Sequence, residues 1–314
     1  MIGLEIASLR VKEQSRQASL IQSQNPEIVG DLLGKINQFD LSSVQNPQFC
    51  SEYASDIFAH LMSSEKYSCI EANYMSRQVE INDKMRAILV DWLIEVHCKF
   101  KLQRETLFIT VSIIDRYLAC QLCSKAQLQL VGVSAMLIAC KYEEIYPPEL
   151  KDFVYITDRA YTKEDVLQME FLILSALSFD ITFPTPHRFL ERYMSVLGEN
   201  EEVLAYSQFL MELALVDVRM IQYPGSILAA AALTQAYKTI SKRVQIDFAD
   251  KERRIEAFIK DGLQISKELS ESLQLCSKEL LFLQLRSKNS SLQAVRKKYS
   301  SPEYTSIHSL ILSS

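Results

Sequence analysis

Two segments of this chain have residue types and spacings that could do chemistry, one on phosphate groups and one on a metal ion. Gly30-Asp-Leu-Leu-Gly34-Lys35 resembles a phosphate-binding loop, but it has one residue too few between its glycines, and Ile36 stands where a hydroxyl would hold magnesium. Cys120-Gln-Leu-Cys123 is a lone thiol pair without the second pair that a tetrahedral zinc site needs. Neither segment predicts a cofactor or a metal site.

Other enzyme signatures are also absent from the sequence. It contains no nucleophile elbow, no His-Glu-x-x-His and no kinase signature, and its four histidines, at 60, 97, 187 and 308, have no motif around them. This favours a binding protein over an enzyme, although a helical enzyme of unknown type remains an alternative.

Composition indicates a helical protein with a substantial core. The chain has 314 residues, 48% of them hydrophobic, and only 7 glycines, which disfavours all-β folds rich in tight turns. The net charge of -5 gives no reason to expect nucleic-acid binding. The odd count of seven cysteines, with no secretory leader, favours reduced intracellular thiols. No apolar run approaches the ~18 residues of a membrane span.

Helical periodicity and capping residues predict where the elements lie. Asn82 or Asp83, Thr162 and Thr185 can cap helices, and Ser124-Lys-Ala-Gln127 has the spacing of a capping box. The expected helices cover about 53–62, 83–100, 104–119, 124–145, 163–177, 186–197, 201–221, 226–240, 263–285 and 292–299.

Two of these helices are rich in small residues and repeat a pattern. Val131–Lys141 and Ile227–Lys238 both contain Ala-x-x-x-Ala-x-Lys. Small side chains let neighbouring helices approach closely, which suits a central helix surrounded by others. The repeat therefore predicts two helical bundles in tandem.

A further helix has an apolar stripe at Met85, Ile88, Leu89 and Trp92, which for an ordinary helix would face a core. Its run Met85-Arg-Ala-Ile-Leu-Val-Asp-Trp-Leu93 is similar to the opening helix of a cyclin box. Further blocks with the same resemblance follow in order: Lys101–Leu107, Val111–Tyr117, Leu128–Val133, Ala139–Glu149, Val154–Asp158, Tyr161–Lys163 and Leu292–Ser300. The chain resembles mitotic cyclins of the A/B group. Met85–Lys99 and Lys125–Tyr146 are most like B-type members and Tyr155–Asp158 is more like A-type members, so the choice between the two types stays open.

The resemblance implies an all-α fold of two tandem five-helix cyclin-box bundles with an N-terminal helix. It implies a partly disordered leader at 1–45, a first box with its preceding helix at 46–182, a second box at 183–300 and a tail at 301–314. It further implies a regulatory subunit that forms a heterodimer with a cyclin-dependent Ser/Thr protein kinase, activates it and recruits substrates. This subunit would control G2/M progression, reside in the nucleus and cytoplasm, and need no cofactor. The alternative is a cyclin-box scaffold that acts in transcription. The acidic net charge disfavours the form of this alternative in which the scaffold binds nucleic acid.

The resemblance also assigns roles to residues. Lys141 and Glu170 match kinase-binding positions, with Phe171, Leu174 and Tyr155 as apolar contacts nearby. Residue type alone would favour a solvated lysine and glutamate or an internal ion pair, and it is the placement within the matched motifs that favours kinase binding. Arg86 and Asp115 match an internal pair between the first two main helices, and Leu130 matches a core position. A patch for Arg-x-Leu segments of substrates or inhibitors is implied at Met85, Ile88, Leu89, Trp92, Glu95 and Gln129.

Three features depart from the family pattern or add to it. The sequence before Tyr53 has no Arg-x-x-Leu destruction motif, since Arg16 is followed at the leucine position by Ser19. The second box reads Phe189-Leu-Glu-Arg where B-type members often have Phe-Leu-Arg-Arg. Ser301-Pro302 is a minimal proline-directed phosphorylation site, a dipeptide that also occurs by chance.

Overall fold

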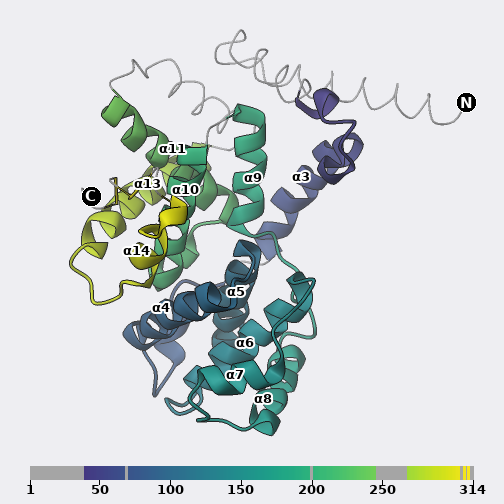
Figure 1. Cartoon of the computed structure of the whole chain (residues 1–314), viewed down its shortest axis with the longest axis vertical. Helices are drawn as coiled ribbons and strands as arrows, with labels where there is room; N and C mark the ends of the chain where they lie inside the picture. Colours follow the sequence, from purple (N-terminus) through teal and green to yellow (C-terminus); the bar gives the residue numbers. More distant parts are fainter. Residues whose placement is uncertain are drawn as a thin grey trace, which may run out of the picture.

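The computed structural model of the chain is helical wherever it describes secondary structure (Figure 1). Most of the leader expected at 1–45 and the start of the helix expected at 263–285 lie outside the described residues. Those residues are 39–67, 70–198, 201–244, 267–304, 307, 308, 310 and 311.

The first bundle lies at one end of the molecule in Figure 1 and surrounds the small-residue helix α6. Every residue of α6 from 130 to 140 is buried. A Cβ atom added to Gly132 would lie 2.7 Å from Cδ1 of Leu89, so the glycine is what lets α4 approach α6 this closely. The helices of this bundle are α4 (Asp83–Phe100), α5 (Arg104–Cys120), α6 (Leu128–Glu143), α7 (Leu150–Ile156) and α8 (Lys163–Ala176).

The second bundle repeats this plan around α11, whose residues Ala229–Ala232 are fully buried. In the described part of the chain its helices are α9 (Pro186–Leu197), α10 (Glu201–Val216), α11 (Gly225–Val244), α13 (Lys267–Ser287) and α14 (Ala294–Tyr299). The expected all-α fold of two five-helix bundles is thus confirmed for the described residues. Ile307, Leu310 and Ile311, within the expected tail, are buried in the core of this bundle.

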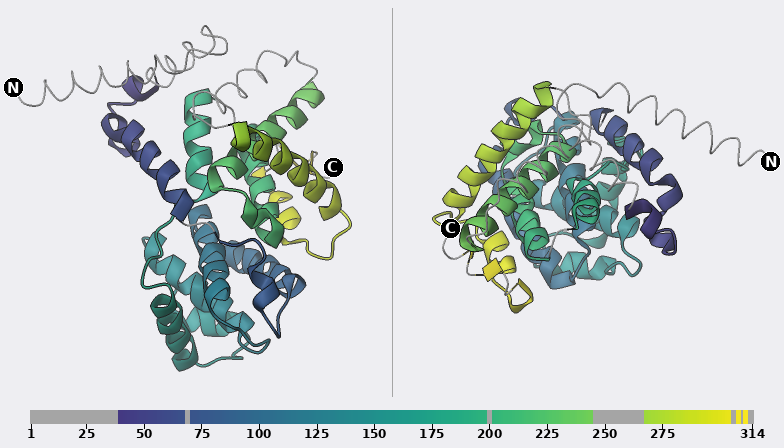
Figure 2. Two further views of the ribbon diagram at one scale, coloured as in Figure 1. Left: turned by 180° about the vertical axis from the view of Figure 1, so that it is seen from behind. Right: turned by 90° about the horizontal axis from the view of Figure 1, so that it is seen from above.

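An N-terminal helix, α3 (Ala54–Ser64), runs beside the second bundle near α9 (Figure 2). The Phe58 ring packs edge-on against Phe189 and Tyr193 of α9, with centroids 5.9 and 6.2 Å apart. Just after α3, the Glu65 carboxylate accepts hydrogen bonds from the hydroxyl and the backbone N–H of Ser226, at 2.6 and 3.0 Å. α3 is therefore tied to the start of the central helix α11.

The two bundles share an apolar junction. Five buried side chains of α4 and α5 belong to the core that the second bundle forms: Val90, Ile94, Leu107, Phe108 and Val111. Fully burying one such side chain contributes about 1.5–3 kcal/mol, so this contact fixes how the bundles are arranged.

Two helix boundaries and one additional helix are the main differences from expectation. α6 begins at Leu128 rather than Ser124, because the Ser124 hydroxyl bonds the Gln127 side chain at 3.0 Å within a turn and caps no helix. α10 ends at Val216, and Asp217 starts a separate 3-10 helix, Val218–Gln222, by accepting from the Arg219 N–H at 3.0 Å. The short helix α7 has no counterpart among the expected elements.

Candidate functional site

Arg86 and Asp115 form a buried, bidentate ion pair between α4 and α5. Arg86 Nε donates to Asp115 Oδ1 at 2.6 Å and Nη2 donates to Oδ2 at 2.7 Å. The two side chains are 1% and 4% exposed. Burial by itself would lower the pKa of Arg86, but the adjacent Asp115 carboxylate outweighs it and the pKa is raised.

Two further groups complete this buried network. The Tyr74 hydroxyl donates to Asp115 Oδ1 at 2.7 Å, and Arg86 Nη1 donates to the carbonyl of Leu215 at 2.9 Å. That carbonyl is in the last turn of α10, where the helix leaves carbonyls unpaired and carries partial negative charge. The pair thus joins the two bundles as well as two helices. Sequence reasoning missed Tyr74 because no local pattern indicates a partner 41 residues away.

Lys141 and Glu170 contact each other across α6 and α8. Lys141 Nζ donates to both carboxylate oxygens of Glu170, at 2.6 and 2.8 Å, so the chain by itself holds them as an internal ion pair. The Lys141 side chain is 49% exposed and that of Glu170 13%. An ammonium group has three donors, so one donor of Lys141 remains for an acceptor outside the chain.

Large apolar side chains are exposed on the elements next to this pair. Tyr155 of α7 is 66% exposed and Phe171 of α8 is 63% exposed. Leu174, in contrast, is partly buried against the first core. We call Lys141, Glu170, Tyr155 and Phe171 the α6–α8 surface. Further exposed apolar side chains on α6, α8 and the loops that follow them are Tyr142, Ile145, Tyr146, Leu167, Leu172 and Phe179.

The expected docking patch on α4 is only partly exposed. Ile88 is 51% exposed, while Met85 and Trp92 are partly buried against the first core. Leu89 is not available to a ligand: it is 5% exposed and packs toward Gly132. Glu95 is exposed and Gln129 of α6 is half-buried; Leu130 lies in the core. We call Met85, Ile88, Trp92 and Glu95 the α4 patch.

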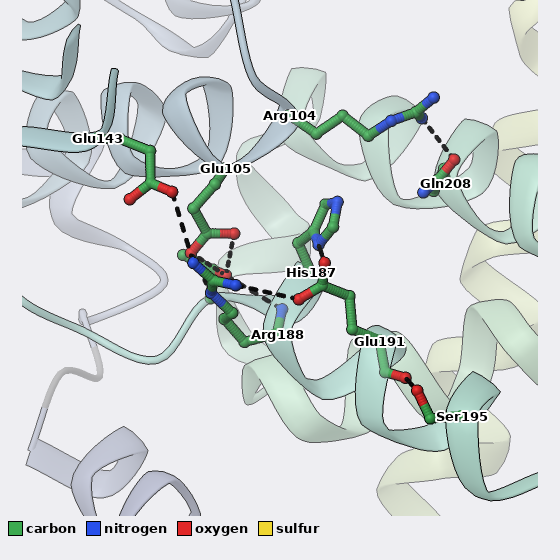
Figure 3. Close-up of polar contacts among 9 residues, drawn as sticks. Arg104, Glu105, Glu143, His187, Arg188, Glu191, Ser195 and Gln208 are labelled. Atoms are coloured by element: carbon green, nitrogen blue, oxygen red, sulfur yellow. Dashed lines mark hydrogen bonds and ion pairs between the residues drawn. The ribbon is translucent and has the colours of Figure 1, made fainter. Parts of the chain in front are cut away.

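A second polar cluster lies where the chain passes from one bundle to the next (Figure 3). The Thr185 hydroxyl donates to both carboxylate oxygens of Glu105, at 2.7 and 2.9 Å, and caps α9 by accepting from the Arg188 N–H at 3.3 Å. Arg188 also lies 3.7 Å from Glu105 and 3.4 Å from Glu143. Nothing in the local sequence distinguished Glu105, in the first turn of α5, from an exposed carboxylate.

Glu105 is expected to make stability depend on pH. Burial raises the pKa of Glu105 from 4.5 to about 7, against the opposing effects of the Thr185 hydrogen bond and Arg188. The folded protein therefore holds this proton more tightly than the unfolded chain, and the associated stability is fully present below pH 4.5 and is lost as pH rises through 7.

Glu105→Gln removes this titration while keeping an acceptor for Thr185. Between pH 4.5 and 7, we expect the wild-type free energy of unfolding to fall relative to that of the variant by about 3 kcal/mol. Urea unfolding of both proteins at several pH values measures this difference. Parallel pH profiles would contradict a raised pKa for Glu105.

Two properties of the described residues bear on membrane and metal binding. None of the helices described is both long and apolar enough to cross a membrane. Among the same residues, no group of three or more histidine, cysteine or acidic side chains is arranged to hold a metal ion.

Family models match both bundles. The model "Cyclin, N-terminal domain" matches residues 56–182, and "Cyclin, C-terminal domain" matches residues 184–312. Together they cover more than half of the chain, and their boundary falls at the linker before α9.

Individual relatives and a solved structure agree with these matches. Cyclin-B2-1 of Oryza sativa subsp. japonica is 41% identical over 261 residues, which are 83% of this chain and 59% of the rice protein. The G2/mitotic-specific cyclin-B2 of Oryzias luzonensis is 45% identical over 212 residues, 68% of this chain and 55% of the fish protein. A viral cyclin from herpesvirus saimiri superposes with a TM-score of 0.62 at 19% identity, covering 72% of this chain and 97% of that one. The chain thus spans less than two thirds of the length of these curated relatives.

Proposed function

This chain belongs to the cyclin family and resembles its B-type mitotic members, and on that premise we propose that it is the regulatory subunit of a cyclin-dependent Ser/Thr protein kinase acting at G2/M. It binds the kinase as a heterodimer, activates it, and recruits substrates.

The observation that supports this proposal is the α6–α8 surface. Phe171, next to Glu170 on α8, and Tyr155, on the neighbouring helix α7, expose most of their side chains, and the Lys141–Glu170 pair retains a free donor. Exposed apolar side chains with polar neighbours are typical of protein-binding sites, because a monomer gains nothing from leaving them in water. The buried helices beneath them, α6 above all, make the surface rigid.

A rigid surface is sufficient to activate a kinase. An active kinase needs its strand lysine paired with the glutamate of its C helix, and its activation loop ordered. A partner that binds only the conformation with this pair in place shifts the population of kinase molecules towards it. The chain then supplies binding energy, and the kinase supplies the catalytic groups.

The test is reconstitution with purified components. The full chain is mixed with each member of a panel of purified cyclin-dependent kinases, and complex formation is followed by size-exclusion chromatography and substrate phosphorylation by radioactive phosphate transfer. We expect at least one kinase to co-elute with the chain and to phosphorylate faster. A panel in which every kinase stays unbound and unaccelerated would refute the proposal.

Two accompanying proposals have separate readouts. We propose that the chain has no phosphotransfer activity by itself, which incubation with ATP and substrate but without kinase measures. We also propose that it resides in both the nucleus and the cytoplasm, which imaging of a fluorescently tagged chain measures. Signal confined to one compartment would contradict the second proposal.

We further propose that the α4 patch recruits substrates carrying Arg-x-Leu. Trp92→Ala removes apolar surface that a leucine would cover, so phosphorylation of an Arg-x-Leu substrate should fall about tenfold, while a short peptide lacking the motif is unaffected. Ile88→Ala should act in the same direction with less risk to the core, since Ile88 is 51% exposed. Leu122→Ala, at an exposed position outside the patch, is the matched control. Equal losses on both substrates would indicate core damage.

A further inference from the structure

The end of the second bundle is attached to the α4 patch through two carboxylates one helical turn apart. Asp91 Oδ1 accepts from the backbone N–H of Ala294 at 3.0 Å, which caps the start of α14. Glu95 Oε1 lies 3.2 Å from Nζ of Lys297, one turn into the same helix. Residues 202 positions apart in the chain thus meet at the edge of the patch.

The position of Lys297 is fixed by its neighbours. The next residue, Lys298, makes a buried ion pair with Glu212 at 2.6 Å, with side chains 8% and 1% exposed. The hydroxyl of Tyr299 donates to the same carboxylate at 2.7 Å. Because α14 is anchored at both of its ends, the Lys297 ammonium stays at high effective concentration around Glu95.

The contact itself is open to solvent and therefore exchangeable. Lys297 is 70% exposed and Glu95 51% exposed at the side chain. Exposed ion pairs of this kind are weak because water screens both charges, so a competing cation can displace the lysine. Glu95 follows Ile88 and Trp92 at helical spacing on the same side of α4, where it would meet a basic residue of a ligand whose leucine lies on those side chains.

We propose that Lys297 sets the specificity of the α4 patch by competing with the basic residue of the docking segment for Glu95. This inference rests on the proposed docking function of the patch. A ligand arginine must first release Lys297, so its ion pair adds less affinity than a free Glu95 would give. The patch then selects ligands mainly by the leucine that they bury.

Peptide binding to the full-length chain tests this competition. Fluorescence anisotropy is measured with one peptide carrying Arg-x-Leu and a matched peptide carrying Ala-x-Leu. Lys297→Ala should strengthen binding of the arginine peptide about two- to fivefold and leave binding of the alanine peptide unchanged, since one exposed ion pair is released. The same substitution in a Glu95→Gln background should have no effect. Lys278→Ala, at an exposed lysine on α13, controls for the loss of one positive charge.

Different outcomes distinguish a failure of competition by Lys297 from a failure of docking at the α4 patch. Gains equal for both peptides, a gain that persists without the Glu95 carboxylate, or no gain at all would overturn competition by Lys297 while docking stands. If neither peptide binds the wild-type chain and Trp92→Ala leaves substrate phosphorylation unchanged, the docking function fails and this inference fails with it.

Discussion

Arg86→Ala is expected to lower the free energy of unfolding by about 3–5 kcal/mol, the largest effect of any single substitution proposed for this chain. The substitution leaves the Asp115 carboxylate buried, with only the Tyr74 hydroxyl still donating to it. It also removes the donor that Arg86 gives to the Leu215 carbonyl at the end of α10. An uncompensated buried charge is costly because the interior cannot replace the water it lost.

Urea unfolding followed by circular dichroism measures this effect, and an exposed pair provides the control. Arg77 lies 2.9 Å from Glu71, with side chains 53% and 68% exposed. Arg77→Ala should cost no more than about 1 kcal/mol, because solvent screens such a pair. A similar small loss for Arg86→Ala would show that water reaches Asp115 in the folded protein, contrary to its burial.

The double substitution Lys141→Ala with Glu170→Ala is expected to weaken kinase binding by about a hundredfold or more while leaving helix content unchanged. Charge-assisted hydrogen bonds contribute about 1.5–3 kcal/mol each, and every 1.4 kcal/mol is tenfold in affinity. The chain already holds the two side chains together, so their effects are not additive and the double variant is the cleaner measurement. It also leaves neither charge without its partner.

Isothermal titration with the kinase identified by reconstitution provides the affinity. Lys163→Ala with Glu164→Ala is the matched control: it removes the same two charges at exposed positions in the first turn of α8. We expect this control to bind as the wild type does. Undiminished binding by the Lys141 and Glu170 variant would reject the assignment of the α6–α8 surface and leave the fold untouched.

Local signals in the sequence predicted much of the architecture. Thr162 caps α8 as expected, and the structure extends this to a capping box: its hydroxyl accepts from the Asp165 N–H at 3.1 Å, and Asp165 accepts from the Thr162 N–H at 2.8 Å. Thr185 followed by Pro186 begins α9 as expected. These features depend on residues within one helical turn, which a sequence displays directly.

The parts that could not be predicted depend on contacts between distant elements. Ile88 and Leu89 are adjacent and equally apolar, yet one is half exposed and the other buried, because the close approach of α6 decides which of them faces inward. Tyr74 and Lys297 find their partners across 41 and 202 residues. Hydrophobic periodicity specifies a helix face but not what will cover it.

The shared core at the junction has a practical consequence for anyone dividing this protein. A fragment ending near residue 182 would keep α4 and α5 but lose the second-bundle side chains that cover Val90, Ile94 and Phe108. These buried apolar side chains would then be exposed to water. Such a half would precipitate or self-associate, even though each bundle looks like an independent repeat in the sequence. The two bundles share one plan, but the first does not bury all of its apolar surface without the second.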